Sequence, residues 1–293
     1  MATTVAAQES DAPTYQDGIS PWPLAMNTST IRPASVAEKV EVTARAGWDA
    51  LELWTHDLEA WEKESGDLND LRKKIEDAGL YVADVIGLWD CMPADEDEYR
   101  KMMDTTKRRM EMAAAVGSKH IACLPLPDRD PFDLKQAAAR YREILDIGLN
   151  EIGIHPAFEF VSVFKGVRRL GQAAAVAIDT DHPQAMIVPD TFHLFNGGSG
   201  FNGISKLQGD FIAIFHWNDI AGGEPDTLGD SHRIYPGDGV LPLEQALRDL
   251  RDIGYRNPLS LEMFHREEWK KDPLLVAQTG LQKMRDQIAK ALA

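Results

Sequence analysis

Residues 211–219 read FIAIFHWND, and residues 259–264 read LSLEMF. Each stretch is a short apolar run that carries one histidine or glutamate near its end. Two similar runs come earlier in the chain, GIHPAFEF at 153–160 and AMIVPDTF at 185–192. Continuous apolar runs of this length predict strands that are covered by helices on both faces, as in a parallel sheet.

The same pattern extends over most of the chain. The expected strands are residues 18–21, 48–54, 81–90, 120–125, 153–160, 185–191, 211–219 and 259–264. Helical periodicity separates them at 35–47, 68–78, 98–116, 134–150, 167–178, 200–208, 241–253 and 272–292. Several of these helices end at a glycine, as in Ala46-Gly47 and Ile253-Gly254, where a left-handed cap is favoured.

Alternating strands and helices form either an open doubly wound sheet or a closed barrel. No GxGxxG motif follows the first expected strand, which argues against a dinucleotide-binding sheet. Eight such units in 293 residues favour the barrel. We therefore expect an α/β protein with a single (β/α)₈ TIM barrel over residues 18–293. Residues 1–17 are polar and aperiodic, and we expect them to form a flexible N-terminal arm.

The charge balance excludes several kinds of partner. Lys and Arg total 31 against 47 Asp and Glu, a net charge of −16, which disfavours nucleic acid and anionic membrane surfaces. No apolar run approaches the roughly 18–20 residues of a membrane-spanning helix. The first residues lack a basic start and an apolar stretch, so we do not expect a secretion signal. Cys91 and Cys123 lack a CxxC context and are interpreted as small apolar core residues. Free thiols fit a reducing compartment, so we expect a cytoplasmic protein.

Four potential metal ligands lie on four consecutive expected strands, Glu159, Asp190, His216 and Glu262. The active site of such barrels lies at the carboxyl ends of the strands. A charge within an apolar strand costs several kcal/mol unless it is paired or bound to a cation. Three carboxylates and one imidazole at one mouth therefore predict a divalent metal. This donor set suits Mn²⁺ best, with Mg²⁺, Co²⁺ or Zn²⁺ as alternatives.

These residues, with their neighbours, also carry a family resemblance. The motifs are Glu159, Asp190-Thr191-Phe192-His193, His216-Trp217-Asn218-Asp219, Arg233 with Pro236-Gly237-Asp238-Gly239, and Gly254-Tyr255 before Leu261-Glu262. Together they resemble the xylose-isomerase-like TIM-barrel superfamily. Within it, they are most similar to the sugar phosphate isomerase/epimerase group, which includes ketose 3-epimerases and inosose-metabolising enzymes. The similarity begins near residue 18 and is densest from 150 to 265.

The resemblance implies roles for individual residues. In the ketose 3-epimerases, this pattern corresponds to a Glu-Asp-His-Glu metal site, here Glu159, Asp190, His216 and Glu262. The two glutamates would act as catalytic acid and base on opposite faces of the carbon next to a carbonyl. His193 would bind substrate, and Arg233 would hold a hydroxyl or the developing enediolate charge.

The chain departs from that pattern at two places. The epimerases have a second glutamate six residues after the first ligand, where this chain has Lys165. A lysine there would bind an anionic substrate group, act as an acid, or simply be a solvated surface residue. The segment AGGEPDTLGDSH, between Asp219 and Arg233, is an insertion near the expected mouth.

Four other residues are candidate substrate contacts. Trp54 and Trp89 lie at strand ends and would stack on a sugar ring or pack in the core. Glu52 shares the face of Trp54 and would bond to substrate or pair with a lysine. His155, four residues before Glu159, is interpreted as a general base, a residue behind the ligands, or a buried packing histidine.

The leading hypothesis is a divalent-metal-dependent sugar isomerase or epimerase that transfers a proton next to a carbonyl. The alternative on the same barrel is a lyase that dehydrates a keto-sugar or keto-inositol or cleaves a 3-keto-glycoside. A DNA-repair endonuclease of the same superfamily needs more histidines and a basic face, and a non-catalytic sugar-binding barrel needs no metal. We expect a small carbohydrate substrate and, by analogy with similar barrels, a homo-oligomer.

Overall fold

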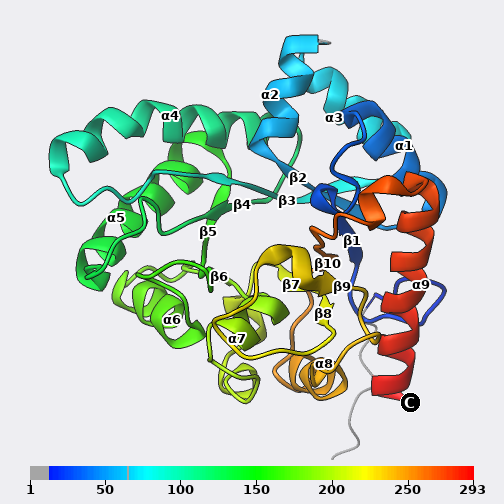
Figure 1. Ribbon diagram of the computed structural model, residues 1–293. Helices are drawn as coiled ribbons and strands as arrows, with labels where there is room; N and C mark the ends of the chain where they lie inside the picture. The colour runs from blue at the N-terminus through cyan, green and yellow to red at the C-terminus, as the bar shows by residue number, and fades with distance from the viewer. Residues whose placement is uncertain (1–12, 65) are drawn as a thin grey trace, which may run out of the picture.

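The computed structural model describes residues 13–64 and 66–293. Within these ranges, eight parallel strands form one sheet in the order β6-β5-β4-β3-β2-β1-β10-β7. Isolated bridges from Ile187 to Ile212 and from Asp190 to His216 join its two ends, which confirms the (β/α)₈ barrel (Figure 1). The barrel strands are β1 Leu24–Asn27, β2 Ala50–Trp54, β3 Tyr81–Leu88, β4 His120–Cys123, β5 His155–Glu159, β6 Ile187–Val188, β7 Phe215–Trp217 and β10 Leu259–Leu261.

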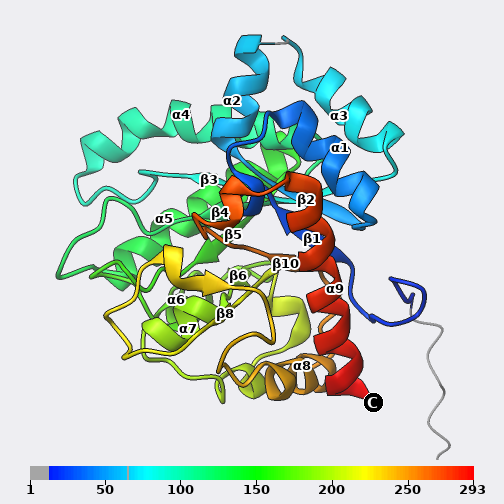
Figure 2. The same ribbon diagram turned by 45° about the vertical axis from the view of Figure 1, so that its right-hand side comes forward.

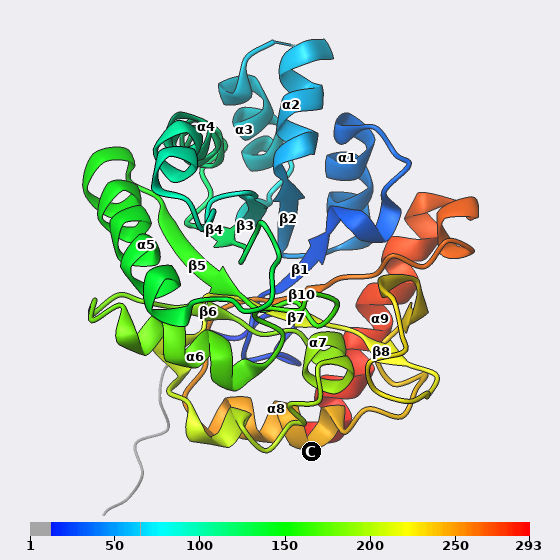
Figure 3. The same cartoon turned by 60° about the vertical axis from the view of Figure 1, so that its left-hand side comes forward.

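Helices surround the strands, as the view along the barrel shows (Figure 3). They are α1 Val36–Ala46, α2 Thr55–Glu64, α3 Leu68–Asp77, α4 Glu96–Ala115, α5 Leu134–Ile147, α6 Leu170–Asp179, α7 Thr191–Asn196, α8 Leu243–Asp252 and α9 Pro273–Leu292. The last helix, α9, packs against both α1 and α8, so the end of the chain completes the ring beside its beginning (Figure 2).

Small side chains line the amino-terminal part of the barrel interior. Ala25, Ala50, Ala122 and Ala157 belong to an inner apolar cluster, whereas their strand neighbours pack outward against the helices. Side chains alternate between the two faces of a strand. The inward positions that follow these alanines, two residues further along each strand, therefore come at the carboxyl end. Three of them are polar, Asn27, Glu52 and Glu159.

The first strand lies further along the chain than the sequence pattern predicts. Residues 18–21 are not a barrel strand, because Gly18 has φ +87° and the Tyr15 and Ser20 backbones close a tight turn with an N···O distance of 2.8 Å. The first barrel strand is instead β1, which pairs with both β2 and β10. This correction matters because β1 ends at Asn27, a residue of the site.

Other elements also differ from the sequence-based expectation. Two helices were not anticipated, α2 directly after β2 and the short α7 directly after Asp190. Of the expected helix 200–208, only a 3₁₀ turn at Ile204–Lys206 forms. The insertion before Arg233 is the loop of a small antiparallel hairpin, β8 Asp219–Ile220 and β9 Arg233–Ile234. We call residues 221–232 the β8–β9 loop.

Residues 1–12 of the expected N-terminal arm lie outside the described residues. The remainder contacts the barrel, since the Gln16 side-chain amide donates to the carbonyl of Gly47 at 3.1 Å. In the part of the chain that the structure describes, none of the helices combines the length and apolar character needed to cross a membrane.

A buried ion pair holds α2 against α1. Lys39 of α1 and Asp57 of α2 are both almost fully buried, and Nζ lies 2.7 Å from Oδ1. The other carboxylate oxygen accepts a hydrogen bond from Thr28 Oγ1 at 2.6 Å. Removing one partner of such a pair leaves a buried charge without compensation.

We expect Lys39→Met to lower the free energy of unfolding by about 3–5 kcal/mol. The matched control is Lys73→Met, which removes an exposed ion pair with Asp77 at 2.6 Å. An exposed pair contributes at most about 1 kcal/mol. Urea denaturation of both variants measures the difference, and equal effects would contradict a structural role for the buried pair.

Candidate active site

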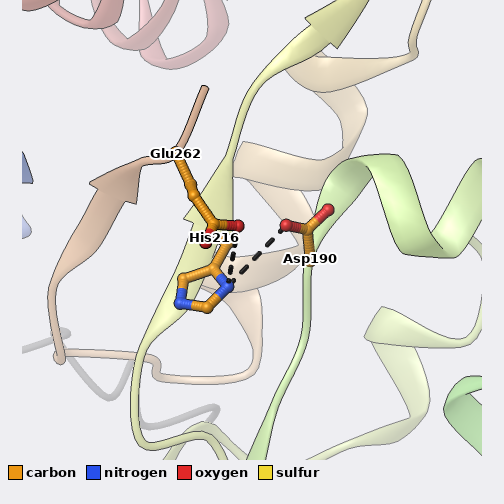
Figure 4. A group of neighbouring side chains, drawn as sticks. All are labelled: Asp190, His216 and Glu262. Atoms are coloured by element: carbon orange, nitrogen blue, oxygen red, sulfur yellow. Dashed lines mark ion pairs between the residues drawn. The ribbon is translucent and has the colours of Figure 1, made fainter. Parts of the chain in front are cut away.

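Closure of the barrel brings the predicted ligands together. The bridge between Asp190 and His216 joins the two end strands at the carboxyl end of the barrel. Nδ1 of His216 lies 3.3 Å from Glu159 Oε1, 3.7 Å from Asp190 Oδ2 and 3.4 Å from Glu262 Oε2. Figure 4 shows the carboxylates of Asp190 and Glu262 facing this nitrogen. All four side chains are at most 4% exposed.

Glu52 orients the imidazole of His216 from behind. Its Oε1 lies 2.7 Å from Nε2, so Nε2 carries the proton and Nδ1 faces the carboxylates. Oε2 of Glu52 accepts hydrogen bonds from Asn27 Nδ2 at 2.7 Å and Ser260 Oγ at 2.5 Å. Strand register explains these contacts, because Asn27 is paired with Glu52 and Ser260 with His216.

The site has metal-ligating side chains, and buried polar atoms without a hydrogen-bond partner, that suit a divalent metal. Nδ1 of His216 and Oε2 of Glu159 are buried and have no hydrogen-bond partner among the described residues. Ligand atoms of Asp190, His216 and Glu262 all lie within 4.8 Å of one another. Buried polar atoms without partners are rare unless water or an ion satisfies them. Three carboxylates and one imidazole therefore fit a divalent cation, as the sequence predicts.

The burial of several charged side chains together shifts the pKa values of the candidate ligands. Burial raises the pKa of Glu262 well above its usual range, with repulsion from neighbouring carboxylates adding to it. Burial opposes protonation of His216, but the charges of Glu52, Glu262 and Glu159 outweigh it and raise the pKa of the imidazole. Burial likewise opposes ionisation of Asp190, whose pKa is nevertheless lowered by Arg233. The group therefore carries an excess of negative charge that a cation would balance.

Arg233 is the cation closest to the carboxylates. Its Nη1 donates to Asp190 Oδ2 at 2.5 Å and to Glu262 Oε2 at 2.6 Å. Its Nε and Nη2 donate to Asp230 Oδ1 at 3.2 and 2.8 Å. Arg233 is itself almost fully buried. The sequence assigns it to substrate, whereas here its guanidinium bridges two candidate ligands and the β8–β9 loop.

A cavity of about 200 Å³ opens above this group. Its lining is Trp54, Ile86, Trp89, Leu124, Glu159, Val161, Val163, Phe164, His193, Asp230, Arg233, Glu262 and Phe264. Trp54 and Trp89 stack with ring centres 5.6 Å apart, and Phe264 meets Trp54 edge-on at 5.8 Å. The cavity is thus an apolar chamber with polar groups gathered at one side.

His193 contributes a hydrogen-bonding group to this cavity. The backbone N of Ser162 lies 3.3 Å from Nδ1, and its hydroxyl oxygen lies 2.9 Å from the same atom. Nη2 of Arg233 lies 3.2 Å from the other ring nitrogen, Nε2, so each nitrogen of the ring has a protein donor beside it. Burial lowers the pKa of His193 and keeps the ring neutral. His193 is therefore held between Ser162 and Arg233 at the side of the cavity.

Two predicted substrate contacts do not reach the cavity. His155 begins β5 at the amino end of the barrel, where its Nε2 lies 2.5 Å from the carbonyl of Gln184. Its four-residue separation from Glu159 spans the strand, which places it at the opposite end. Lys165 is exposed and does not line the cavity, and its backbone N–H donates to the Asp128 carboxylate. Glu52 does not line the cavity either, because it is fully buried behind His216.

Several residues of the site were not anticipated from sequence, namely Asn27, Asp84, Ser162, Asp230 and Ser260. Asn27 was missed because the first strand was placed too early. Asp84 is paired with Glu52 and is fully buried, and burial together with the Glu52 charge raises its pKa well above the usual range. The sequence does carry a signal for Asn27 and Glu52. Each follows by two positions an alanine that points into the barrel, Ala25 or Ala50, and therefore shares its inward face.

Comparison with known proteins places the chain in a family. Residues 40–287 match the family described as xylose isomerase-like TIM barrel. The chain belongs to this family. The inosose isomerase of Bacillus velezensis is 25% identical over 247 residues, which cover 83% of this chain and 88% of that protein.

Further proteins that are similar to this chain carry other names. The 3-dehydroshikimate dehydratase of Pseudomonas putida is 24% identical over 79% of this chain but only 36% of that protein. The crystal structure of an IolI protein with a bound zinc atom superimposes with a TM-score of 0.86 at 23% identity, covering 92% of this chain and 99% of that one. Proteins named as isomerases and as dehydratases are therefore both similar to this chain.

We expect Glu52→Gln to weaken binding of Mn²⁺ or Zn²⁺ by about 10–100-fold, because the neutral amide no longer holds the imidazole as a carboxylate does. Equilibrium dialysis with metal analysis measures the change. Glu59→Gln, at an exposed position on α2, is the matched control and should bind metal as the wild type does. Unchanged affinity in a folded Glu52→Gln protein would show that Glu52 does not orient the ligand.

Proposed function

We propose that this protein is a divalent-metal-dependent carbohydrate isomerase or epimerase that transfers a proton at a carbon next to a carbonyl. The observation that carries the proposal is the convergence of Glu159, Asp190 and Glu262 on the orphaned Nδ1 of His216 beside the cavity. The zinc in the related IolI structure and the isomerase relatives support it. A divalent cation held by these four residues would polarise the carbonyl and acidify the adjacent C–H.

The two glutamates are the candidates for moving the proton. Glu159 comes from β5 and Glu262 follows β10, so they approach the cavity from different strands of the barrel, and both line it. One carboxylate removes the proton from carbon, and the other returns a proton, which changes the configuration or moves the carbonyl. His193, which also lines the cavity, is the candidate to contact a substrate oxygen. Arg233 donates hydrogen bonds to the carboxylates of Asp190 and Glu262 and keeps them in position.

The cavity favours a small, uncharged, cyclic polyhydroxy ketone. A volume of about 200 Å³ suits a single ring, and the wall of Trp54, Trp89 and Phe264 suits stacking against its C–H face. Among the described residues that line the cavity, the only arginine or lysine is Arg233, and it already bonds to three carboxylates. A phosphate or carboxylate group on the substrate would thus lack a free cationic partner. This chemistry supports a keto-inositol, the substrate class of the inosose isomerases, over a phosphorylated sugar.

Elimination is the second candidate reaction on this site. The 3-dehydroshikimate dehydratase relatives support a lyase that uses the same proton abstraction and then expels water. A shikimate-type substrate carries a carboxylate, for which the cavity offers no free cation. The proposal therefore favours proton return over loss of a leaving group.

Proton NMR in D₂O tests the reaction directly. We expect the Mn²⁺-loaded protein to exchange the C–H next to the carbonyl of a keto-inositol and to form an isomer. Glu159→Gln and Glu262→Gln should each slow exchange at least about 100-fold, because each removes an acid or base. Glu111→Gln, at an exposed position on α4, is the control. Release of water and an unsaturated ketone would instead establish the lyase, and no exchange with keto-inositols or ketohexoses would overturn both.

Metal removal provides an independent test. Dialysis against a chelator should abolish exchange, and addition of Mn²⁺ should restore it more fully than Mg²⁺, Co²⁺ or Zn²⁺, given the carboxylate-rich donor set. Metal content is measured in the same samples. Full exchange by a protein shown to be free of metal would contradict the proposed role of the four ligands.

A further inference from the structure

Two thiols are in contact within the wall beside the cavity. Sγ of Cys91 lies 3.4 Å from Sγ of Cys123, although 32 positions separate them in sequence. Both residues are buried and at most 1% exposed. Cys123 ends β4, and Cys91 lies in the loop between β3 and α4. The sequence has no CxxC motif, so only the fold shows that these cysteines form a pair.

The backbones on either side hold the two thiols next to each other. Leu124 N donates to Leu88 O at 3.2 Å, and Met92 N donates to Leu126 O at 2.7 Å. These bonds flank Cys91, and the barrel pairs Leu88 with Cys123. A disulfide needs the sulfurs at about 2.05 Å, a further approach of about 1.4 Å from their contact distance. Rotation of the two side chains about their χ1 angles moves a sulfur by that order of distance.

We propose that Cys91 and Cys123 form a modification site at which hydrogen peroxide converts the two thiols to an intramolecular disulfide. Peroxide transfers one oxygen to the Cys91 sulfur, its O–O bond breaks, and water leaves a sulfenic acid. The Cys123 sulfur then attacks the sulfenic sulfur, the S–S bond forms, and the departing hydroxyl takes the thiol proton as a second water. One peroxide is reduced to two waters while two thiols are oxidised to one disulfide.

The surroundings of the two thiols affect the rate of their oxidation and determine which part of the protein the disulfide constrains. Burial raises the pKa of the Cys123 thiol, so the reaction is slower than that of an exposed thiolate. The loop of Cys91 also carries Trp89, and Cys123 directly precedes Leu124, and both of these neighbours line the cavity. The disulfide therefore links two parts of the cavity wall and encloses all of α4 within a covalent loop.

Peptide mapping of the full-length protein tests the proposal. The reduced wild type is exposed to hydrogen peroxide, quenched, unfolded, alkylated and digested without a reducing agent. We expect a peptide pair that links Cys91 to Cys123 and is lighter by about 2 Da than the sum of the two reduced peptides. Dithiothreitol should separate it and restore two alkylatable thiols. Oxidation of methionines in the same sample verifies that the oxidant acted.

Cys91→Ala and Cys123→Ala are the matched variants, and each should lose the linked peptide while its remaining thiol stays open to alkylation. The proposal is overturned if the wild type keeps both thiols free after its methionines have been oxidised. It is also overturned if the thiols progress to sulfinic or sulfonic acids without a link, or if the link joins two chains. The wild-type measurement decides the matter even where a variant does not fold.

Discussion

The hydrogen bond between Glu52 and His216 is the interaction on which the arrangement of the site depends. A histidine has two ring nitrogens, and the one that a metal can use is decided by the partner of the other. Glu52 occupies Nε2, and Asn27 and Ser260 hold Glu52 in place. Nδ1 is therefore turned toward the three carboxylates. Without that bond, the imidazole would be free to present either nitrogen.

The bond forms only because the barrel closes in one register. Asn27 and Glu52 are cross-strand partners, as are Ser260 and His216, and a bridge joins His216 to Asp190. These residues come from five strand ends but lie at the same level of the cylinder. A shift of one residue in any strand would turn its side chain to the helical side of the sheet. Barrel register is thus the structural origin of the site geometry.

The β8–β9 loop is connected to the same charges. Asp230 of the loop bonds to Arg233, which in turn bonds to Asp190 and Glu262. Asn196, at the end of α7, accepts from the backbone N–H groups of Asp226 and Leu228 and so anchors the loop to the barrel. The arrival of a second cation beside Arg233 would change the balance of these contacts. The β8–β9 loop, which contributes Asp230 to the cavity lining, is therefore linked through Arg233 to the same carboxylates.

Much of this architecture could be predicted from sequence because it depends on local patterns. Apolar runs, glycine-terminated helices and the spacing of Glu159, Asp190, His216 and Glu262 each reflect interactions within one βα unit. The first strand was misplaced because a short buried run such as Leu24–Asn27 resembles any other apolar tetrapeptide until its partners are known. The sequence left Lys165 open between a substrate contact and a surface lysine, and His155 between a site residue and a packing histidine. Sequence spacing does not show which end of a strand, or which side of a loop, a side chain occupies.

The amino-acid sequence by itself determined the class of fold and the identity of four polar residues that a strand cannot bury without compensation. Only the tertiary structure decided that Glu52 lies behind His216, that Arg233 bridges two carboxylates, and that Cys91 contacts Cys123. The physical reason is that hydrophobic periodicity and apolar character can be recognised within a single segment of the sequence. Hydrogen-bond partners and charge neighbours are instead set by the register between segments that the chain brings together from distant positions.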